Sequence, residues 1–232
     1  MSATVDNPNG AGNLPLSSMP RTIQPEILDT LSPQHPDAIH SRRDLRLINR
    51  FMGSHRWFLK VLSARLRPGE RVLEIGAGSG DLARQLSAAN LPTDGLDFLP
   101  PPETWPALSK WHTEDLRAFD GYDRYPIIMG NLIFHHLTDP ELTELGLRLR
   151  RAARVICASE PLRRRLPHLF MRIFGVLFGA SQVTLHDAHA SISGGFAGDE
   201  LARSLGLLPP AWDVETSTGP FGAYRMIAVR RA

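Results

Sequence analysis

The sequence contains one cysteine, Cys157, among its 232 residues, so an intramolecular disulfide bond is excluded. A chain without disulfide bonds is typical of a reducing compartment, and we expect a cytoplasmic protein. Cys157 lies within the apolar run 155–158, and no general base stands beside it in the sequence. We therefore expect it to be a core residue and not a nucleophile.

Long apolar runs are missing as well, and none reaches the ~20 residues that a membrane-spanning helix requires. The N-terminus lacks the basic and apolar regions of a signal peptide. The net charge is only +2, and Lys60 and Lys110 are the only lysines. Without a large charge excess or a basic patch interleaved with aromatic residues, the composition gives no support for nucleic-acid binding.

What the sequence does contain is a pattern of strand, glycine turn and helix at residues 71–83 (RVLEIGAGSGDLA). Four residues with strand character, 72–75, lead into three glycines at alternate positions, and a helix-like run follows them. Only glycine lets the backbone pass close under a ligand. The pattern is therefore typical of the first unit of a nucleotide-binding α/β fold.

The spacing of the glycines distinguishes between ligands. A dinucleotide fingerprint, G-x-G-x-x-G, needs a third glycine where Asp81 stands, and a phosphate-binding loop needs a Gly-Lys-Ser/Thr ending that is missing here. The pattern is instead E-x-G-x-G-x-G, with Glu74 inside the strand. A carboxylate at that position suits a ligand that carries positive charge.

The run 73–80 (LEIGAGSG) resembles motif I of the class I S-adenosylmethionine-dependent methyltransferases, and in particular the bacterial enzymes that act on small molecules. The resemblance implies an α/β, Rossmann-like, seven-stranded and mostly parallel sheet with an antiparallel C-terminal hairpin and helices on both faces. It also implies S-adenosyl-L-methionine as the cofactor. Glu74 would bind the cofactor's ammonium group. The backbone along its methionine part would be that of Gly76, Ala77, Gly78 and Gly80.

Acidic residues follow the next two predicted strands. Asp97 falls 17 residues beyond the last glycine of the turn, close to the ~20 expected for an acid at the tip of the second strand. There it can accept hydrogen bonds from both ribose hydroxyls. Asp115 ends the predicted third strand, 111–116, and the resemblance implies that it contacts the adenine amino group. The neighbouring Phe98 and Leu116 belong to the same predicted cofactor site.

A fourth strand is predicted at 127–129, with Asn131 at its carboxyl edge, where open α/β sheets bind ligands. Asn131 and the following His135-His136 pair resemble motif IV of small-molecule methyltransferases, which places Asn131 where cofactor meets acceptor. A phenol or enol acceptor needs a base, and the predicted catalytic residues are His136 and His186, which can titrate near neutral pH. The alternative for the histidine pair is packing alone, at the start of a helix.

The rest of the chain is predicted to be arranged around this unit. We expect a disordered tail at 1–20, an N-terminal helical cap at 21–68 and the methyltransferase domain at 69–232. Within the cap, Ser41 to Asp44 has the spacing of a capping box, at the start of a helix that continues to Pro68. Further strands are predicted at 154–160, 212–216 and 224–229, and helices at 81–86, 142–149, 166–178 and 198–205.

Two segments after the fifth strand have more than one interpretation. The segment 162–178 combines a basic cluster with a wide apolar stripe. The plain interpretation is packing against the core. The more specific hypothesis is that the stripe forms a wall of the binding site for an apolar substrate, or makes peripheral contact with a membrane. In the segment 184–193, His186 and His189 have a spacing that could chelate a metal. However, the segment lacks helical patterning and methyl transfer from a sulfonium needs no metal, so we predict no metal site.

The predicted function is methyl transfer to oxygen or carbon of a small, apolar, aromatic or phenolic acceptor of a polyketide- or quinone-like kind. The acceptor class rests on a looser resemblance of 41–50, 160–164 and 186–196 to bacterial methyltransferases encoded near polyketide and quinone pathways. An NAD-dependent oxidoreductase is an alternative that Asp81 and the terminal hairpin disfavour. A protein or nucleic-acid methyltransferase is disfavoured because Gly-Asn-Leu-Ile replaces the Asn/Asp-Pro-Pro-Tyr/Phe signature at the fourth strand. A non-catalytic cofactor-binding partner and any oligomeric state remain open.

Overall fold

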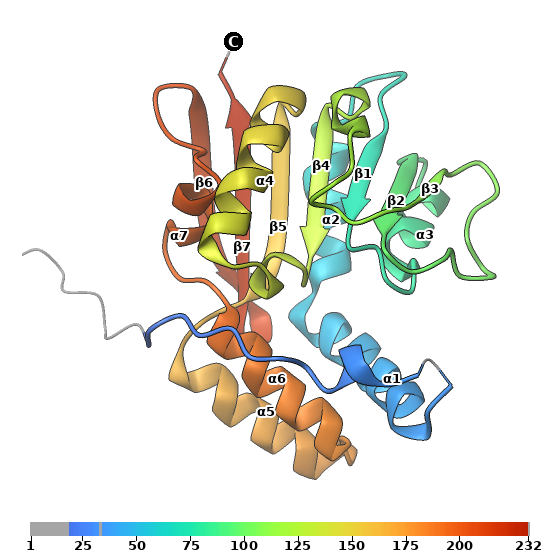
Figure 1. The fold of residues 1–232 in the computed structure, drawn as a ribbon, viewed down its shortest axis with the longest axis vertical. Coiled ribbons are helices and arrows are strands. Elements are labelled where there is room, and N and C mark those ends of the chain that lie inside the picture. The colour runs from blue at the N-terminus through green and yellow to red at the C-terminus, as the bar shows by residue number, and fades with distance from the viewer. Residues whose placement is uncertain (1–18, 33, 232) are drawn as a thin grey trace, which may run out of the picture.

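The computed structural model describes residues 19–32 and 34–231, which form a seven-stranded sheet in the order β3-β2-β1-β4-β5-β7-β6 (Figure 1). β1 to β5 pair in parallel, whereas β7 pairs antiparallel with both β5 and β6. The predicted fold class, with its C-terminal hairpin, is confirmed. The strands are β1 (Val72–Ile75), β2 (Thr93–Asp97), β3 (Trp111–Thr113), β4 (Ile127–Asn131), β5 (Val155–Pro161), β6 (Trp212–Gly219) and β7 (Ala223–Arg230).

The central strands are buried on both faces. Every residue of β1 and β5 is buried, which explains why these segments are mostly apolar, with Glu74 and Glu160 as the acidic exceptions. Cys157 points into this core with no exposed surface, and burial raises the pKa of its thiol to about 12. It is a core residue, as the sequence predicts.

Helices cover both faces of the sheet. On one face, α2 (Ser54–Ser63) and α3 (Asp81–Ala88) pack apolar side chains such as Phe58 and Leu82 against the strands. On the other, α4 (Asp139–Ala152) and α7 (Glu200–Ser204) do the same with Leu142 and Leu201. A capping box at the residue before α4, Thr138, starts that helix. The carboxyl edge of the parallel strands is left uncovered by these four helices.

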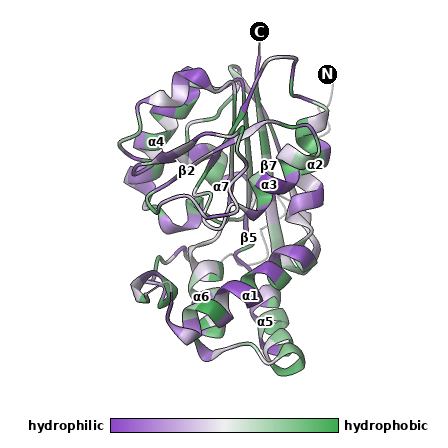
Figure 2. Ribbon diagram, turned by 90° about the vertical axis from the view of Figure 1, so that its right-hand side faces the viewer, coloured by the Kyte–Doolittle hydropathy of each residue, from purple (hydrophilic) through white to green (hydrophobic). Residues whose placement is uncertain are grey.

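Three further helices lie beyond that edge: α1 (Pro36–Met52), α5 (Arg165–Phe178) and α6 (Gln182–Gly194) (Figures 1 and 2). α6 contacts both α1 and α5. Buried polar groups join them, because Asp44 Oδ2 accepts hydrogen bonds from Thr184 Oγ1 at 2.8 Å and from the Ser181 amide at 3.2 Å. These helices form a cap over the end of the sheet where α/β folds bind ligands.

Two predictions about the cap's first helix are wrong. Ser41 and Asp44 do not form a capping box: α1 begins at Pro36, and His35 Nδ1 accepts the capping bond from the Asp37 amide. Two residues three apart also lie on the same face inside a helix, and the face of α1 that carries Ser41 and Asp44 contacts α6. In addition, Gly53, with φ of +65°, ends α1, so the expected single helix is two helices that serve different layers.

The prediction that 184–193 is not helical is also wrong, because α6 runs through it. Its buried residues include Thr184, Asp187, Ala190 and Ile192, so the buried positions mix polar with apolar side chains. A helix that is enclosed by α1, α5 and the turn after β4 has no single apolar stripe for the sequence to reveal. β3 is shorter than predicted, ending at Thr113, so that Asp115 lies in the following turn.

The division into a helical cap at 21–68 and a catalytic domain at 69–232 stays a prediction. Within 21–68, α1 belongs to the cap, whereas α2 packs against the sheet. The predicted tail at 1–20 falls outside the described residues except for its last two. Among the described residues, none of the helices has the length and apolarity to span a membrane.

Candidate active site

The glycine turn joins β1 to α3 at the carboxyl edge of the sheet. Gly76, Gly78 and Gly80 have φ values of +65°, +52° and +68°, in the left-handed region that favours glycine. A Cβ on Gly76 would lie 2.5 Å from Ile133 Cγ1, so a side chain there would collide with the turn after β4. The amides of Gly76 and Ala77 donate to the carbonyl of Leu96 in β2 at 2.8 and 3.2 Å. The turn is therefore anchored to the neighbouring strand.

Asp97 ends β2 and contacts the glycine turn directly. Its Oδ2 accepts a hydrogen bond from the Gly78 amide at 2.8 Å, and its Oδ1 accepts one from the Leu99 amide at 2.9 Å. Each carboxylate oxygen keeps a second lone pair for a further donor. Beside it, Phe98 is 71% exposed, so its ring offers a flat apolar face at the same edge.

Glu74 lies under the turn with only 3% of its surface exposed. Its Oε2 accepts a hydrogen bond from the Ala83 amide in the first turn of α3, at 3.1 Å. Burial raises the pKa of Glu74 to about 8, although the Ala83 bond acts in the opposite direction. The side chain is therefore largely protonated at neutral pH, and a nearby cation would favour its ionised form.

Asp115 and Leu116 lie in the turn after β3, which is tied to β2 because the Glu114 amide donates to the Asp97 carbonyl at 3.0 Å. Asp115 is partly exposed and its carboxylate is paired with Arg117, whose guanidinium lowers the pKa of that carboxyl. Leu116 is half-buried. The structure thus brings the two predicted acidic strand tips together at one edge.

Asn131 ends β4 and meets α1. Its Nδ2 donates to Asn49 Oδ1 at 3.2 Å, while its own Oδ1 is buried and has no hydrogen-bond partner among the described residues. A buried acceptor without a partner is costly and marks a position where a ligand could donate. The next residue, Leu132, has φ of +58°, a strained conformation for a side chain of its size.

The histidine pair follows in η3 (Phe134–His136), and it is His135 that is buried. Glu160 of β5, with no exposed surface, accepts hydrogen bonds from the amides of Ile133 and Phe134, both at 3.0 Å, and from His135 Nδ1 at 2.7 Å. Burial alone would lower the pKa of His135, but Glu160 and Glu26 raise it to about 9.

The two predicted catalytic histidines lie on either side of the segment 26–29. His136 is partly exposed, and its Nδ1 lies 4.0 Å from Asp29 Oδ2. His186 Nδ1 lies 3.0 Å from Asp187 Oδ1. The Asp187 carboxylate in turn accepts hydrogen bonds from the amides of residues 27 and 28, at 2.8 and 2.9 Å. These acids and histidines therefore belong to one cluster, next to the carboxyl end of β4.

Sequence reasoning missed three members of this cluster, Glu26, Asp29 and Glu160. Nothing in the sequence connects residues 26–29 with the histidines more than 100 positions later. Glu160 did carry a signal, since it is an acid that ends an otherwise apolar buried strand, much as Glu74 stands within one.

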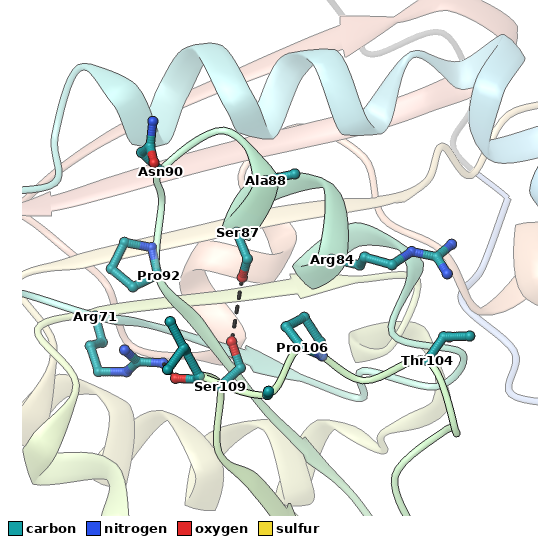
Figure 3. A pocket seen from close by; sticks show the side chains of 11 residues that line it. Arg71, Arg84, Ser87, Ala88, Asn90, Pro92, Thr104, Pro106 and Ser109 are labelled. Atoms are coloured by element: carbon teal, nitrogen blue, oxygen red, sulfur yellow. Dashed lines mark hydrogen bonds between the residues drawn. The ribbon is translucent and has the colours of Figure 1, made fainter.

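A well-defined cavity lies elsewhere in the described part of the chain. It has a volume of about 610 Å³ and is lined by residues that precede β1, β2 and β3, including Arg71, Pro92 and Ser109, together with Ser87 of α3 (Figure 3). A contact of 3.4 Å between Ser87 Oγ and Ser109 Oγ spans it. The amino ends of parallel strands face away from the glycine turn, so this cavity is separate from the candidate site.

No protein-family model matches the sequence, and no curated protein matches it. Solved structures do. Plantazolicin methyltransferase BpumL in complex with SAH (S-adenosylhomocysteine) is 11% identical, with a TM-score of 0.64 over 88% of this chain and 93% of that one. The chain has the class I methyltransferase fold. In this chain β7 lies between β5 and β6, and the glycine turn lies at the same edge of the sheet as the cap (Figure 1).

Two other structures extend the comparison. BpumL in complex with a triazolic desmethylPZN analog and SAH is 10% identical, with a TM-score of 0.68 and coverage of 88% of this chain and 93% of that one. Magnesium protoporphyrin IX methyltransferase (ChlM) from Synechocystis PCC 6803 with bound SAM is 16% identical, with a TM-score of 0.54 and coverage of 82% and 84%. At these identities the likeness concerns the methyltransferase fold, and residue roles must come from the geometry.

The buried carboxyl of Glu74 predicts a pH-dependent stability. Because its pKa is raised from about 4.5 to about 8, the native state holds a proton that the unfolded chain releases, so this residue's contribution to stability is lost as pH rises towards 8. The Tm of the wild type should therefore fall, relative to that of Glu74→Gln, as the pH rises from about 4.5 to about 8. The exposed Glu215→Gln serves as the control and should follow the wild type. Plots of Tm against pH that run parallel for the wild type and Glu74→Gln would contradict the raised pKa of Glu74.

Proposed function

We propose that the protein transfers a methyl group from S-adenosyl-L-methionine to a small-molecule acceptor. The observation that carries the proposal is the E-x-G-x-G-x-G turn between β1 and α3, bonded to Asp97 at the carboxyl edge of a methyltransferase-type sheet. The structural neighbours BpumL and ChlM were solved with SAH or SAM bound, which supports the same cofactor here.

The residues present fit this cofactor. The left-handed glycines leave an open backbone surface for its methionine part, and Glu74 below them is the partner for its ammonium group. Asp97 would hold the ribose hydroxyls, with Phe98 against the adenine. Asp115 and Leu116 would contact the far side of the adenine, and the orphaned amide oxygen of Asn131 would face the junction between cofactor and acceptor.

When bound, the cofactor supplies an already electrophilic methyl group. The protein's task is then to hold the acceptor in line, to exclude water and to take up any proton that the acceptor loses. Proximity and orientation can supply ~7–11 kcal/mol of such a barrier. We assign proton uptake to His186, oriented by Asp187, with His136 as the second candidate.

For the acceptor, we propose an apolar aromatic or phenolic compound of a polyketide- or quinone-like kind, methylated on oxygen or carbon. Its support is an aromatic cluster within the cap. Phe51 of α1 lies 5.4 Å from Phe178 of α5 and 5.2 Å from Phe221 of η4 (Pro220–Gly222), measured between ring centroids. Phe178 and Phe221 remain about half exposed, so their faces are free to contact a flat apolar molecule.

The cofactor assignment predicts binding of S-adenosyl-L-methionine and S-adenosylhomocysteine in calorimetry. Asp97→Ala should weaken both about 10- to 100-fold, because a charge-assisted hydrogen bond contributes roughly 1.5–3 kcal/mol. Glu215→Ala on β6 removes an exposed acid far from the turn and should bind like the wild type. Wild-type protein that binds neither compound, or that binds NADH instead, would overturn the proposal. Cofactor binding without methylation of any acceptor would favour a non-catalytic partner.

The histidine assignment predicts a rate effect without a binding effect. With a phenolic acceptor identified by its mass shift, His186→Gln should lower kcat about 100-fold or more and leave cofactor affinity unchanged, since general base catalysis contributes typically 10²–10⁴-fold. His136→Gln tests the second candidate in the same assay. The control is His189→Gln, whose ring pairs with His168 between α5 and α6. Unchanged kcat in His186→Gln and His136→Gln would remove both assignments.

We also propose peripheral membrane contact through 162–178, where an apolar acceptor would dissolve. α5 is largely hydrophobic in Figure 2. Five of its apolar side chains have about half or more of their surface exposed: Leu166, Leu169, Ile173, Val176 and Leu177. Arg164, Arg165 and Arg172 are exposed on the same helix or just before it, whereas Arg163 is buried and bonded to Glu200. An apolar face flanked by arginines suits an anionic bilayer surface.

Co-sedimentation with anionic phospholipid vesicles tests this contact. The wild type should bind, and the double variant Val176→Asp with Leu177→Asp should bind at least tenfold less, because it places charge on the most exposed part of the face. Leu147→Asp adds one such charge at an exposed leucine of α4 and should bind like the wild type, and each single variant of the pair provides the comparison at equal charge. Absence of wild-type binding would end the membrane proposal and leave the catalytic one intact.

A further inference from the structure

Glu26, His135 and His136 place three potential ligand atoms close together. One carboxylate oxygen and one ring nitrogen from each histidine lie within 4.8 Å of one another. A cation at the centre of such a triangle would need each ligand atom to move by about 0.7 Å or less to reach the ~2.1 Å typical of metal–nitrogen and metal–oxygen bonds. The two imidazole rings have centroids 4.1 Å apart and planes 36° from parallel, so the His136 ring must also turn for both nitrogens to face the ion.

The orientation of His135 is the second observation. Its Nε2 is buried and has no hydrogen-bond partner within the part of the chain that the structure describes, and it faces Glu26 Oε1 at 3.5 Å. The opposite nitrogen, Nδ1, is held by the Glu160 carboxylate at 2.7 Å. A carboxylate behind one ring nitrogen fixes the tautomer and directs the other nitrogen outward, which is the usual support of a metal-bound histidine.

The surroundings add negative charge, while the Arg21 guanidinium donates to the His135 carbonyl at 3.4 Å. Asp29 Oδ2 lies 4.0 Å from His136 Nδ1 and adds a second carboxylate nearby. Glu26 is held in place by a hydrogen bond from Ser191 Oγ of α6. The ligand atoms therefore come from two parts of the fold, the segment 26–29 and η3, and Ser191 of the cap supports the first of them.

We propose that Glu26, His135 and His136 bind a divalent first-row transition-metal ion such as Zn²⁺ or Fe²⁺. Two imidazoles and a carboxylate select these ions over Mg²⁺ and Ca²⁺, which prefer ligand sets made of oxygen alone. This differs from the sequence-based expectation of no metal site, which considered only the His186 and His189 spacing. The proposal does not depend on methyl transfer.

Three protein ligands leave at least one coordination position open, as in catalytic metal sites. η3 follows the carboxyl end of β4, so that position would lie at the edge where the acceptor is proposed to bind. An anionic oxygen, such as a phenolate or enolate, is the ligand that this ion would take there. Only the binding of an acceptor oxygen to the ion rests on the proposed function. It leaves His186 as the proton acceptor.

The test is titration of metal-free full-length protein with Co²⁺ and Zn²⁺, followed by calorimetry and by the visible absorption of Co²⁺. The wild type should bind one ion with the absorption of a nitrogen-containing site. Glu26→Gln and His136→Gln, both at partly exposed positions, should weaken binding at least tenfold. Glu160→Gln touches no metal and should weaken it about 10- to 100-fold through His135. Circular dichroism confirms that each variant is folded.

His189→Gln is the matched control, because it removes a histidine from the other histidine pair in the cap. It should bind Co²⁺ like the wild type. Wild-type protein that binds no ion, or Glu26→Gln and His136→Gln that bind it unchanged, would overturn the metal site. Cofactor calorimetry on the same metal-free samples separates the two proposals, since loss of cofactor binding affects only the proposed function.

Discussion

The carboxylate of Glu160 organises the end of the sheet. It is fully buried, and it is stabilised there because it accepts hydrogen bonds from consecutive amides of the turn after β4 as well as from an imidazole. These bonds hold Leu132 in its left-handed conformation and place Ile133 against Gly76. One buried charge therefore couples the turn that carries the histidines to the glycine turn of β1.

Polar contacts join α1 and α2 to this edge. Asn49, in the last turns of α1, reaches Asn131 of β4, and Ser54, at the start of α2, shares a buried hydrogen bond of 3.0 Å with Ser159 of β5. Gly53 between them allows α1 to leave the sheet. Contacts of this kind depend on direction and distance, so they fix the position of the cap over the site more closely than apolar packing alone.

Local patterns in the sequence predict most of the fold, because strands, the glycine turn and α4 are specified by neighbouring residues. The acids Asp97 and Asp115 could be located because they follow strands whose order the motif implies. The helix α6 could not be predicted from the sequence, since it is enclosed on several sides and its apolar residues do not recur with helical spacing. Glu26 could not be connected with His135 either, because only the folded chain brings together residues so far apart.

The segment 26–29 has a consequence for the order in which the molecule assembles. Its amides bond Asp187 across 160 residues of sequence, and its carboxylate faces a histidine of the turn after β4. The entropy of closing so long a loop opposes these contacts, so we expect the segment to join the molecule after the local turns and helices have formed. The cluster of acids and histidines is complete only when these contacts are made.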